Sequence, residues 1–160
     1  MPTAIISQWG KRLPFSRKGL TKNINSLLRL CNSDKDELSI VLVTDATIAH
    51  YNETYRGITG PTNVLSFPMG EKLVPGKAAK LLGDVIISVD TASREARELQ
   101  VSVQERVIIL VIHGLLHLLG YDHERSAAEA AVMEKKEQEL LSKLCPTVLP
   151  CVHHDHPDFT

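Results

Sequence analysis

The chain has 160 residues, 43% hydrophobic and 23% charged, which is the size and composition of one soluble domain with a core of its own. Its formal net charge of −1 gives no overall sign of nucleic-acid or membrane affinity, and three cysteines without a CxxC pair argue against a secreted disulfide framework. The longest apolar stretch, residues 107–119, contains two histidines and is too short to span a bilayer. We therefore expect a cytoplasmic protein that does not enter a membrane.

The first half of the chain predicts strands and helices in turn. Residues 4–9 are apolar and predict an edge strand, after which Ser16 can cap a helix over 17–31. The β-branched run 38–44 predicts a core strand, and Asp45 can cap a helix over 46–55. The alternating run 63–69 predicts another strand, which ends at Pro68 or lies at an edge because Pro68 cannot donate a ladder hydrogen bond.

The second half begins with a predicted loop over 70–80 and a strand over 82–89. Asp90 or Thr91 then caps a helix to about residue 99. Ser102 and Glu105 have the spacing of a capping box for a helix over 103–119, which is apolar on nearly every side and should be buried. A last helix is predicted over 126–144, with an inner face that includes Val132.

This order of elements lacks the strict alternation of a doubly wound fold. It predicts an α+β (mixed α/β) fold, in which about five helices wrap a small sheet of about four strands. The buried central helix should present its histidines at an open edge of the sheet. We expect a single domain over 1–149 and a His-rich flexible tail over 150–160.

A histidine motif, H-G-L-L-H-L-L-G-Y-D-H, runs from His113 to His123. His113 and His117 are four residues apart and share one face of a helix, and Gly120 allows a turn that returns His123 to the same point. Three imidazoles with one open position are the layout of a catalytic zinc site, although the same ligands accept other divalent transition metals. Metal-bound water would be acidic enough to supply hydroxide near neutral pH.

The spacing is that of the metzincin proteases, but their general-base Glu is replaced by Gly114. Three interpretations stay open. The metal-bound hydroxide needs no base, a carboxylate elsewhere serves, or the nucleophile is a hydroxyl of the substrate, as the 2′-OH of RNA can be. Asp122 and Asp84 are candidates to accept the second N–H of a ligand imidazole.

Arg56 is the candidate catalytic residue outside the histidine motif. It stands in Y-R-G-I-T-G-P-T-N-V-L-S-F-P, whose glycines and prolines predict a loop of defined path between a helix and a strand. A guanidinium there would stabilise the charge of a phosphodiester transition state. Residues 1–30 carry six Lys or Arg and no Asp or Glu, which indicates a solvated basic helix or a phosphate-facing patch.

The chain resembles the YbeY-type endoribonucleases in three blocks: the histidine motif, residues 55–68, and G-D-V-I-I-S at 83–88. The resemblance implies a zinc-dependent, single-strand-specific endoribonuclease that acts in 16S rRNA 3′-end maturation and ribosome quality control. It implies metal ligands at His113, His117 and His123, an active-site arginine at Arg56, and association with rRNA precursor, the small ribosomal subunit and an Era-type GTPase.

Two other functions remain open on the residues alone. One is a metallopeptidase of metzincin-like geometry, against which Gly114 counts. The other is a non-catalytic ribosome assembly factor with a structural metal.

Overall fold

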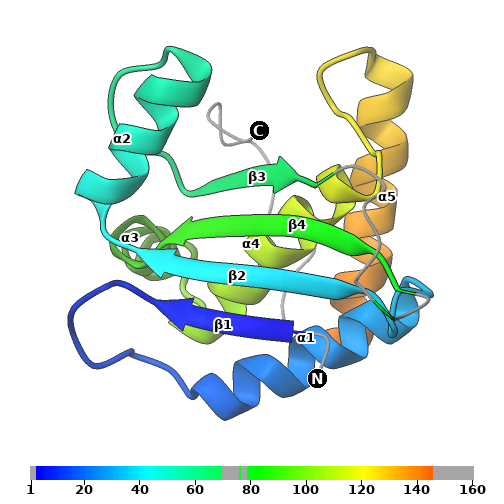
Figure 1. Ribbon diagram of the computed structural model, residues 1–160, viewed down its shortest axis with the longest axis horizontal. Helices are drawn as coiled ribbons and strands as arrows, with labels where there is room; N and C mark the ends of the chain where they lie inside the picture. Colours follow the sequence, from blue (N-terminus) through cyan, green and yellow to red (C-terminus); the bar gives the residue numbers. More distant parts are fainter. Residues whose placement is uncertain (1–2, 70–75, 77–78, 146–160) are drawn as a thin grey trace.

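The computed structural model describes residues 3–69, 76 and 79–145 (Figure 1). Four strands and five helices follow one another in this part of the chain, and the predicted α+β fold is confirmed. Their order is β1 (Thr3–Ser7), α1 (Arg17–Leu30), β2 (Glu37–Val43), α2 (Asp45–Arg56), β3 (Val64–Pro68), β4 (Leu81–Ser88), α3 (Val89–Leu99), α4 (Val103–Leu118) and α5 (Ala127–Leu144). The predicted tail over 150–160 and most of the predicted loop over 70–80 lie outside the described residues, and the division into one domain and a tail stays a prediction.

The four strands form one mixed sheet in the order β1-β2-β4-β3. β1, β2 and β4 are parallel, and β3 is antiparallel to β4. The predictions that the first and third strands lie at edges are both confirmed. The free edge of β3 is where Figure 1 shows α2 and the α4–α5 connection standing above the sheet.

The register of β3 on β4 decides which side chains meet the helices. Ser66 pairs with Val85, and Phe67 pairs with Asp84. Alternate residues of a strand point to opposite faces, so Ser66 and Val85 share one face while Phe67 and Asp84 share the other. The first face is covered by α1, α4 and α5 and holds the main core; α2 packs on the second face near β3 and β4.

The central helix α4 has the predicted start. The Ser102 hydroxyl accepts the N–H of Glu105, and the Glu105 carboxylate accepts the N–H of Ser102, both at 3.1 Å. Residues 106–116 of this helix are all buried. A helix that is apolar all round is stable only inside a core, and α4 packs against β3, β4 and the helices α1, α3 and α5.

Two predicted caps are wrong, by one residue for α2 and by two or three residues for α3. Thr44 caps α2, its hydroxyl accepting the N–H of Thr47 at 3.2 Å, and Ser88 caps α3, accepting the N–H of Thr91 at 3.1 Å. Asp45, the predicted cap, is instead the first helical residue of α2. The reason is that each helix begins directly where a strand ends: Thr44 follows the last residue of β2, and Ser88 is the last residue of β4.

Asp45 links the starts of α2 and α3. Its carboxylate accepts hydrogen bonds from the hydroxyls of Ser88 and Thr91, both at 2.6 Å, and pairs with Arg94 at 2.9 Å. Burial raises the pKa of Asp45, but these three donors outweigh it and hold the pKa below the usual 3.8. The link fixes the direction of α2, which carries Arg56 at its other end.

No single helix in the described part of the chain is long and apolar enough to cross a membrane. α3 and α4 pass that test only as a pair bent by 112°.

Candidate metal centre

The structure brings His113, His117 and His123 together at the end of α4. One ligand atom from each ring lies within 4.8 Å of the others. The ring centroids of His113 are 4.8 Å from His117 and 5.3 Å from His123, and those of His117 and His123 are 5.1 Å apart. Among the described residues this is the one cluster of His, Cys, Asp or Glu side chains with such a geometry.

A left-handed turn at Gly120 returns the chain to the helix. Gly120 has φ +102°, its N–H donates to the carbonyl of His117 at 3.1 Å, and the Tyr121 N–H donates to the carbonyl of Leu116 at 3.0 Å. This pair of bonds is the Schellman motif, which ends a helix at a residue without Cβ strain. The turn predicted at Gly120 is therefore present, and it places His123 opposite the helical histidines.

The imidazole ring of His113 is oriented by a buried carboxylate that sequence reasoning missed. The Oε1 atom of Glu137, on α5, lies 3.4 Å from Nδ1 of His113, and both side chains are buried. Such a pair directs the other ring nitrogen toward a metal. The signal in the sequence is a Glu at helical spacing between apolar Met133 and Leu140, on the face of α5 that is in fact buried. Val132, placed on that face by the prediction, is 59% exposed.

Asp84 is not part of the centre, contrary to the sequence-based suggestion. It lies on the other face of the sheet from Val85, the strand residue that contacts α4. Asp122 does lie beside the centre, but its oxygens accept the N–H of Glu124 at 2.8 Å and pair with Arg125 at 3.2 Å. The hydrogen bond from Glu124, aided by Arg125, holds the pKa of Asp122 below its usual value. The carboxylate thus braces the loop that carries His123.

Gly114 is packed too closely to carry a side chain. A Cβ there would lie 2.7 Å from Cγ1 of Val85 and 3.0 Å from Oγ of Ser66. The hydroxyl of Ser66 also donates to the carbonyl of Gly114 at 3.0 Å, which ties β3 to α4. The missing protease base therefore has a structural cause, since the helix approaches the sheet at this residue.

The three histidines have the chemistry of metal ligands. Burial, together with the neighbouring rings of His113 and His123, lowers the pKa of His117 to about 4. Its imidazole is therefore neutral at neutral pH, as a metal ligand must be. Its Nε2 atom is buried and has no hydrogen-bond partner among the described residues. These features fit a divalent transition metal held by all three rings.

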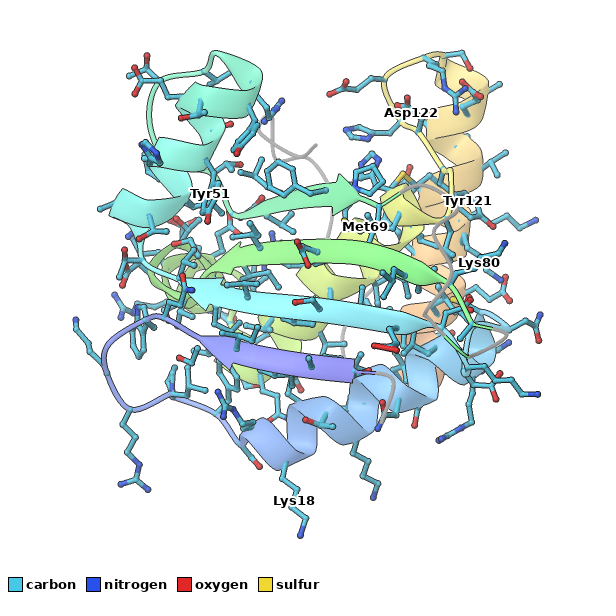
Figure 2. All side chains as sticks on the ribbon, in the orientation of Figure 1. Lys18, Tyr51, Met69, Lys80, Tyr121 and Asp122 are labelled. Carbon is cyan, nitrogen blue, oxygen red and sulfur yellow. The ribbon has the colours of Figure 1, made fainter. Side chains whose placement is uncertain are left out.

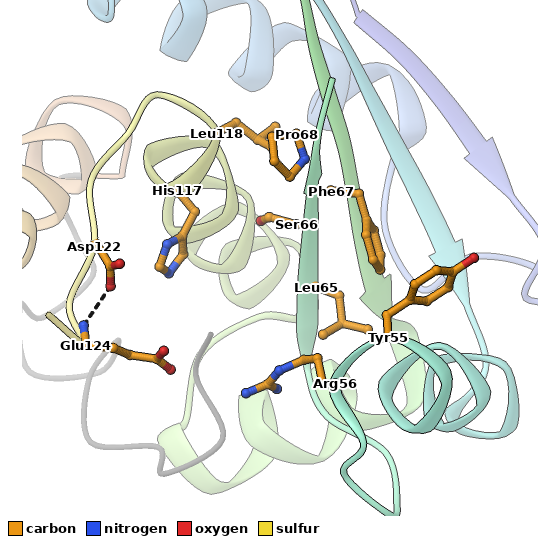
Figure 3. A pocket seen from close by; sticks show the side chains of 10 residues that line it. All are labelled: Tyr55, Arg56, Leu65, Ser66, Phe67, Pro68, His117, Leu118, Asp122 and Glu124. Carbon is orange, nitrogen blue, oxygen red and sulfur yellow. Dashed lines mark hydrogen bonds between the residues drawn. The ribbon is translucent and has the colours of Figure 1, made fainter. Parts of the chain in front are cut away.

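A cleft of about 370 Å³ opens beside His117 and crosses the free edge of β3 (Figure 3). Its lining comes from α2, β3, α4 and the following loop: Tyr55, Arg56, Leu65, Ser66, Phe67, Pro68, His117, Leu118, Asp122 and Glu124. Figure 3 shows the guanidinium of Arg56 pointing from the end of α2 toward the side of β3 where His117 and Glu124 lie. Arg56 and His117 are far apart in the sequence, and the fold brings both to one cleft.

Arg56 is the last residue of α2, not a loop residue as predicted. Its Nη1 donates to Oδ1 of Asn52 at 3.3 Å, and the buried Asn52 amide donates to the carbonyl of Gly60 at 2.9 Å. Gly57 closes the helix in the left-handed region, with φ +68°. Asn52 thus holds both the arginine and the loop after it.

A cluster of histidines at the rim of an arginine-lined cleft is typical of a catalytic metal centre rather than a structural one. A family model described as Endoribonuclease YbeY matches residues 7–145. The chain therefore belongs to the YbeY family of endoribonucleases.

Relatives agree with this assignment. An endoribonuclease YbeY of Geobacter sulfurreducens is 44% identical over 135 residues, which cover 84% of this chain and 90% of that protein. An endoribonuclease YbeY of Persephonella marina is 43% identical over 130 residues, which cover 81% of this chain and 84% of that protein. One of Aquifex aeolicus is 50% identical over 108 residues, which cover 68% of this chain and 70% of that protein. A solution structure of a Thermotoga maritima protein has a TM-score of 0.56, 24% identity and 98% coverage of both chains, which supports the fold.

Proposed function

We propose that the chain is a metal-dependent endoribonuclease, with Zn²⁺ as the metal, that cleaves single-stranded RNA. Its biological role would be 16S rRNA 3′-end maturation and ribosome quality control in the cytoplasm, as the family resemblance implies. The observation that carries the proposal is the cleft shared by His117, one of three clustered imidazoles, and by Arg56. A metal-binding set and a permanent cation at one cleft suit a substrate with a negatively charged reacting group.

The residues divide the work as follows. His113, His117 and His123 hold the metal, and Glu137 orients His113. When bound, the metal supplies a Lewis acid and a water of lowered pKa. Arg56, held by Asn52, binds the phosphate and stabilises the negative charge that develops on its oxygens.

The packing at Gly114 disfavours a peptidase. The metzincin mechanism needs a carboxylate directly after the first histidine, and this position has no room even for a Cβ. Glu124 and Asp122 line the cleft, so a general base from outside position 114 is still compatible with the geometry of the site. A purely structural metal is disfavoured because His117 faces an open cleft instead of a closed core.

The test compares RNA and protein substrates on one metal-loaded preparation. We expect cleavage of single-stranded RNA and none of casein. Arg56→Ala and His113→Ala should each lose RNA cleavage, whereas Arg97→Ala, which removes an exposed arginine on α3 outside the cleft, should keep it. Full RNA cleavage by the metal-free His113 variant would overturn the proposal and indicate a contaminating nuclease.

We also propose that the basic N-terminal segment contacts rRNA of the small ribosomal subunit. Its six cations are Lys11, Arg12, Arg17, Lys18, Lys22 and Arg29. Within the described part of the chain, none of these six side chains forms an ion pair with a carboxylate. Unpaired cations without neighbouring acids attract polyanions.

This basic surface is remote from the metal centre. α1 runs beside β1, at the sheet edge opposite β3, and Figure 2 shows Lys18 pointing outward there while Asp122 lies at the other end of the molecule. An RNA that contacts both surfaces must be extended or part of a particle, as a ribosomal substrate would be. An Era-type GTPase remains a proposed partner, supported by the family resemblance.

A further inference from the structure

An aromatic cluster borders the cleft on the side of β3 opposite the histidines. Tyr51 and Tyr55, one turn apart on α2, are stacked with ring centroids 6.0 Å apart and planes at 20°. Phe67 of β3 contacts both, at 6.1 Å from Tyr51 and edge-on at 5.2 Å from Tyr55. Tyr51 and Phe67 are partly buried and pack against the small core under α2, so they make a firm base for the outer ring.

The contacts of Tyr55 with Tyr51 and Phe67 leave most of its side chain uncovered. It is 65% exposed, the highest value among the exposed large hydrophobic side chains, and its hydroxyl makes no hydrogen bond within the described residues. A single exposed ring is ordinary on a protein surface, but this ring lines a cleft beside Arg56, where the ring of a ligand can reach it. Its two ring neighbours hold it at the rim of the cleft without covering it.

The position of Tyr55 next to Arg56 indicates what the partner is. The two residues are consecutive, and both line the cleft. Figure 3 shows them diverging at the end of α2, with Arg56 toward His117 and Tyr55, beside Phe67, on the other side of β3. A cation for a phosphate and a flat apolar ring for a base, one residue apart, match the alternation of phosphate and base along a nucleic-acid strand.

We propose that Tyr55, backed by Tyr51 and Phe67, is a stacking platform for one unpaired nucleobase near the phosphate held by Arg56. This inference rests on the proposed ribonuclease function and adds a source of its strand preference. A base in a duplex is stacked between its neighbours and has no face to offer, whereas a base in a single strand can lie on the ring. Because every base has an aromatic face, the platform selects single strands without selecting a sequence.

The experiment measures single-turnover cleavage of a short labelled single-stranded RNA against the concentration of metal-loaded enzyme. This yields both Kd and the rate constant at saturation. Tyr55→Ala should raise Kd roughly 10- to 100-fold, the usual loss for one stacked base, and change the saturated rate much less. Tyr55→Phe keeps the ring and should bind as the parent does. Thr54→Ala is the matched control, because it truncates an exposed side chain of α2 that neither lines the cleft nor contacts the aromatic rings.

A second substrate series identifies the contact. Single abasic nucleotides are placed in turn along the RNA. In the parent enzyme one abasic position should weaken binding as much as Tyr55→Ala does, and in the Tyr55→Ala variant that same position should cost nothing further. Equal abasic losses in both enzymes, or unchanged Kd for Tyr55→Ala, would overturn the platform, and the latter would leave the exposed ring to a protein partner. If the parent cleaves no RNA at all, the ribonuclease proposal itself fails, and the two failures are thereby distinguished.

Discussion

Replacing Gly114 by Ala tests whether close packing, rather than lost chemistry, explains the residue after the first histidine. The added Cβ would lie 2.7 Å from one methyl of Val85, 3.1 Å from the other, and 3.0 Å from Oγ of Ser66. Overpacking of this kind costs about 1–3 kcal/mol. The higher helix propensity of Ala returns about 1 kcal/mol. We therefore expect a net loss of about 1 kcal/mol in the free energy of unfolding, or about 2–4 °C in Tm for a chain of this size.

The assay is urea unfolding of the metal-free protein, with Gly19→Ala as the matched control. Gly19 is also helical, but its tightest neighbour is the amide end of Gln104, 3.1 Å from the added Cβ. A flexible side-chain end can move away, so this variant should gain up to about 1 kcal/mol. If the two variants shift the urea midpoint in the same direction by similar amounts, the packing explanation is refuted.

Three further predictions concern the metal, acid stability and RNA contact. Glu137→Gln should weaken metal binding about 10- to 100-fold in a chelator competition, because the carboxylate that orients His113 is lost. Asp45→Asn should cost about 1–2 kcal/mol near neutral pH. Since the pKa of Asp45 is lowered by folding, this contribution is complete above the unfolded value of 3.8 and is lost as the pH falls below it, so the gap in urea midpoint should close in acid. Lys18→Ala with Lys22→Ala should weaken RNA binding at all sequences and flatten its dependence on salt by about 1.5 units of logarithmic slope, since two phosphate contacts are lost.

Each of these has a result that contradicts it. Glu134→Gln changes an exposed residue of α5 and is the control for Glu137→Gln. If both variants lose the same metal affinity, the effect of Glu137 is not specific. A stability gap for Asp45→Asn that persists unchanged below pH 3.8 would assign it to packing instead of charge. Lys135→Ala on α5 is the control for the double lysine variant. If the double variant binds RNA as the parent does, or if Lys135→Ala weakens binding equally, the lysines of α1 do not contact RNA.

Most elements were predictable because their signals are local. The length of the apolar stretch, the two histidines four residues apart and the Ser102–Glu105 capping box predicted α4, and the structure confirms the helix and its cap. Side-chain periodicity and caps act over a few residues, so a single sequence records them. The errors are local as well. Thr44, not Asp45, is the N-cap of α2. Thr and Asp are both favourable N-cap residues, so the sequence does not distinguish two such neighbours.

The sequence by itself determined the spacing of the three histidines and the turn at Gly120, because a helix and a glycine specify where their neighbours lie. Only the tertiary structure decided what surrounds them. The register of β4 turned Asp84 away from the centre, and α5 supplied Glu137 instead. A shift of one residue in the register of a strand exchanges its two faces. Contacts between distant elements depend on strand order and helix packing, and no local sequence pattern encodes either of these. The same packing of α4 on β4 leaves Gly114 without room for a side chain, so the feature that first distinguished this motif from a protease is a consequence of the fold.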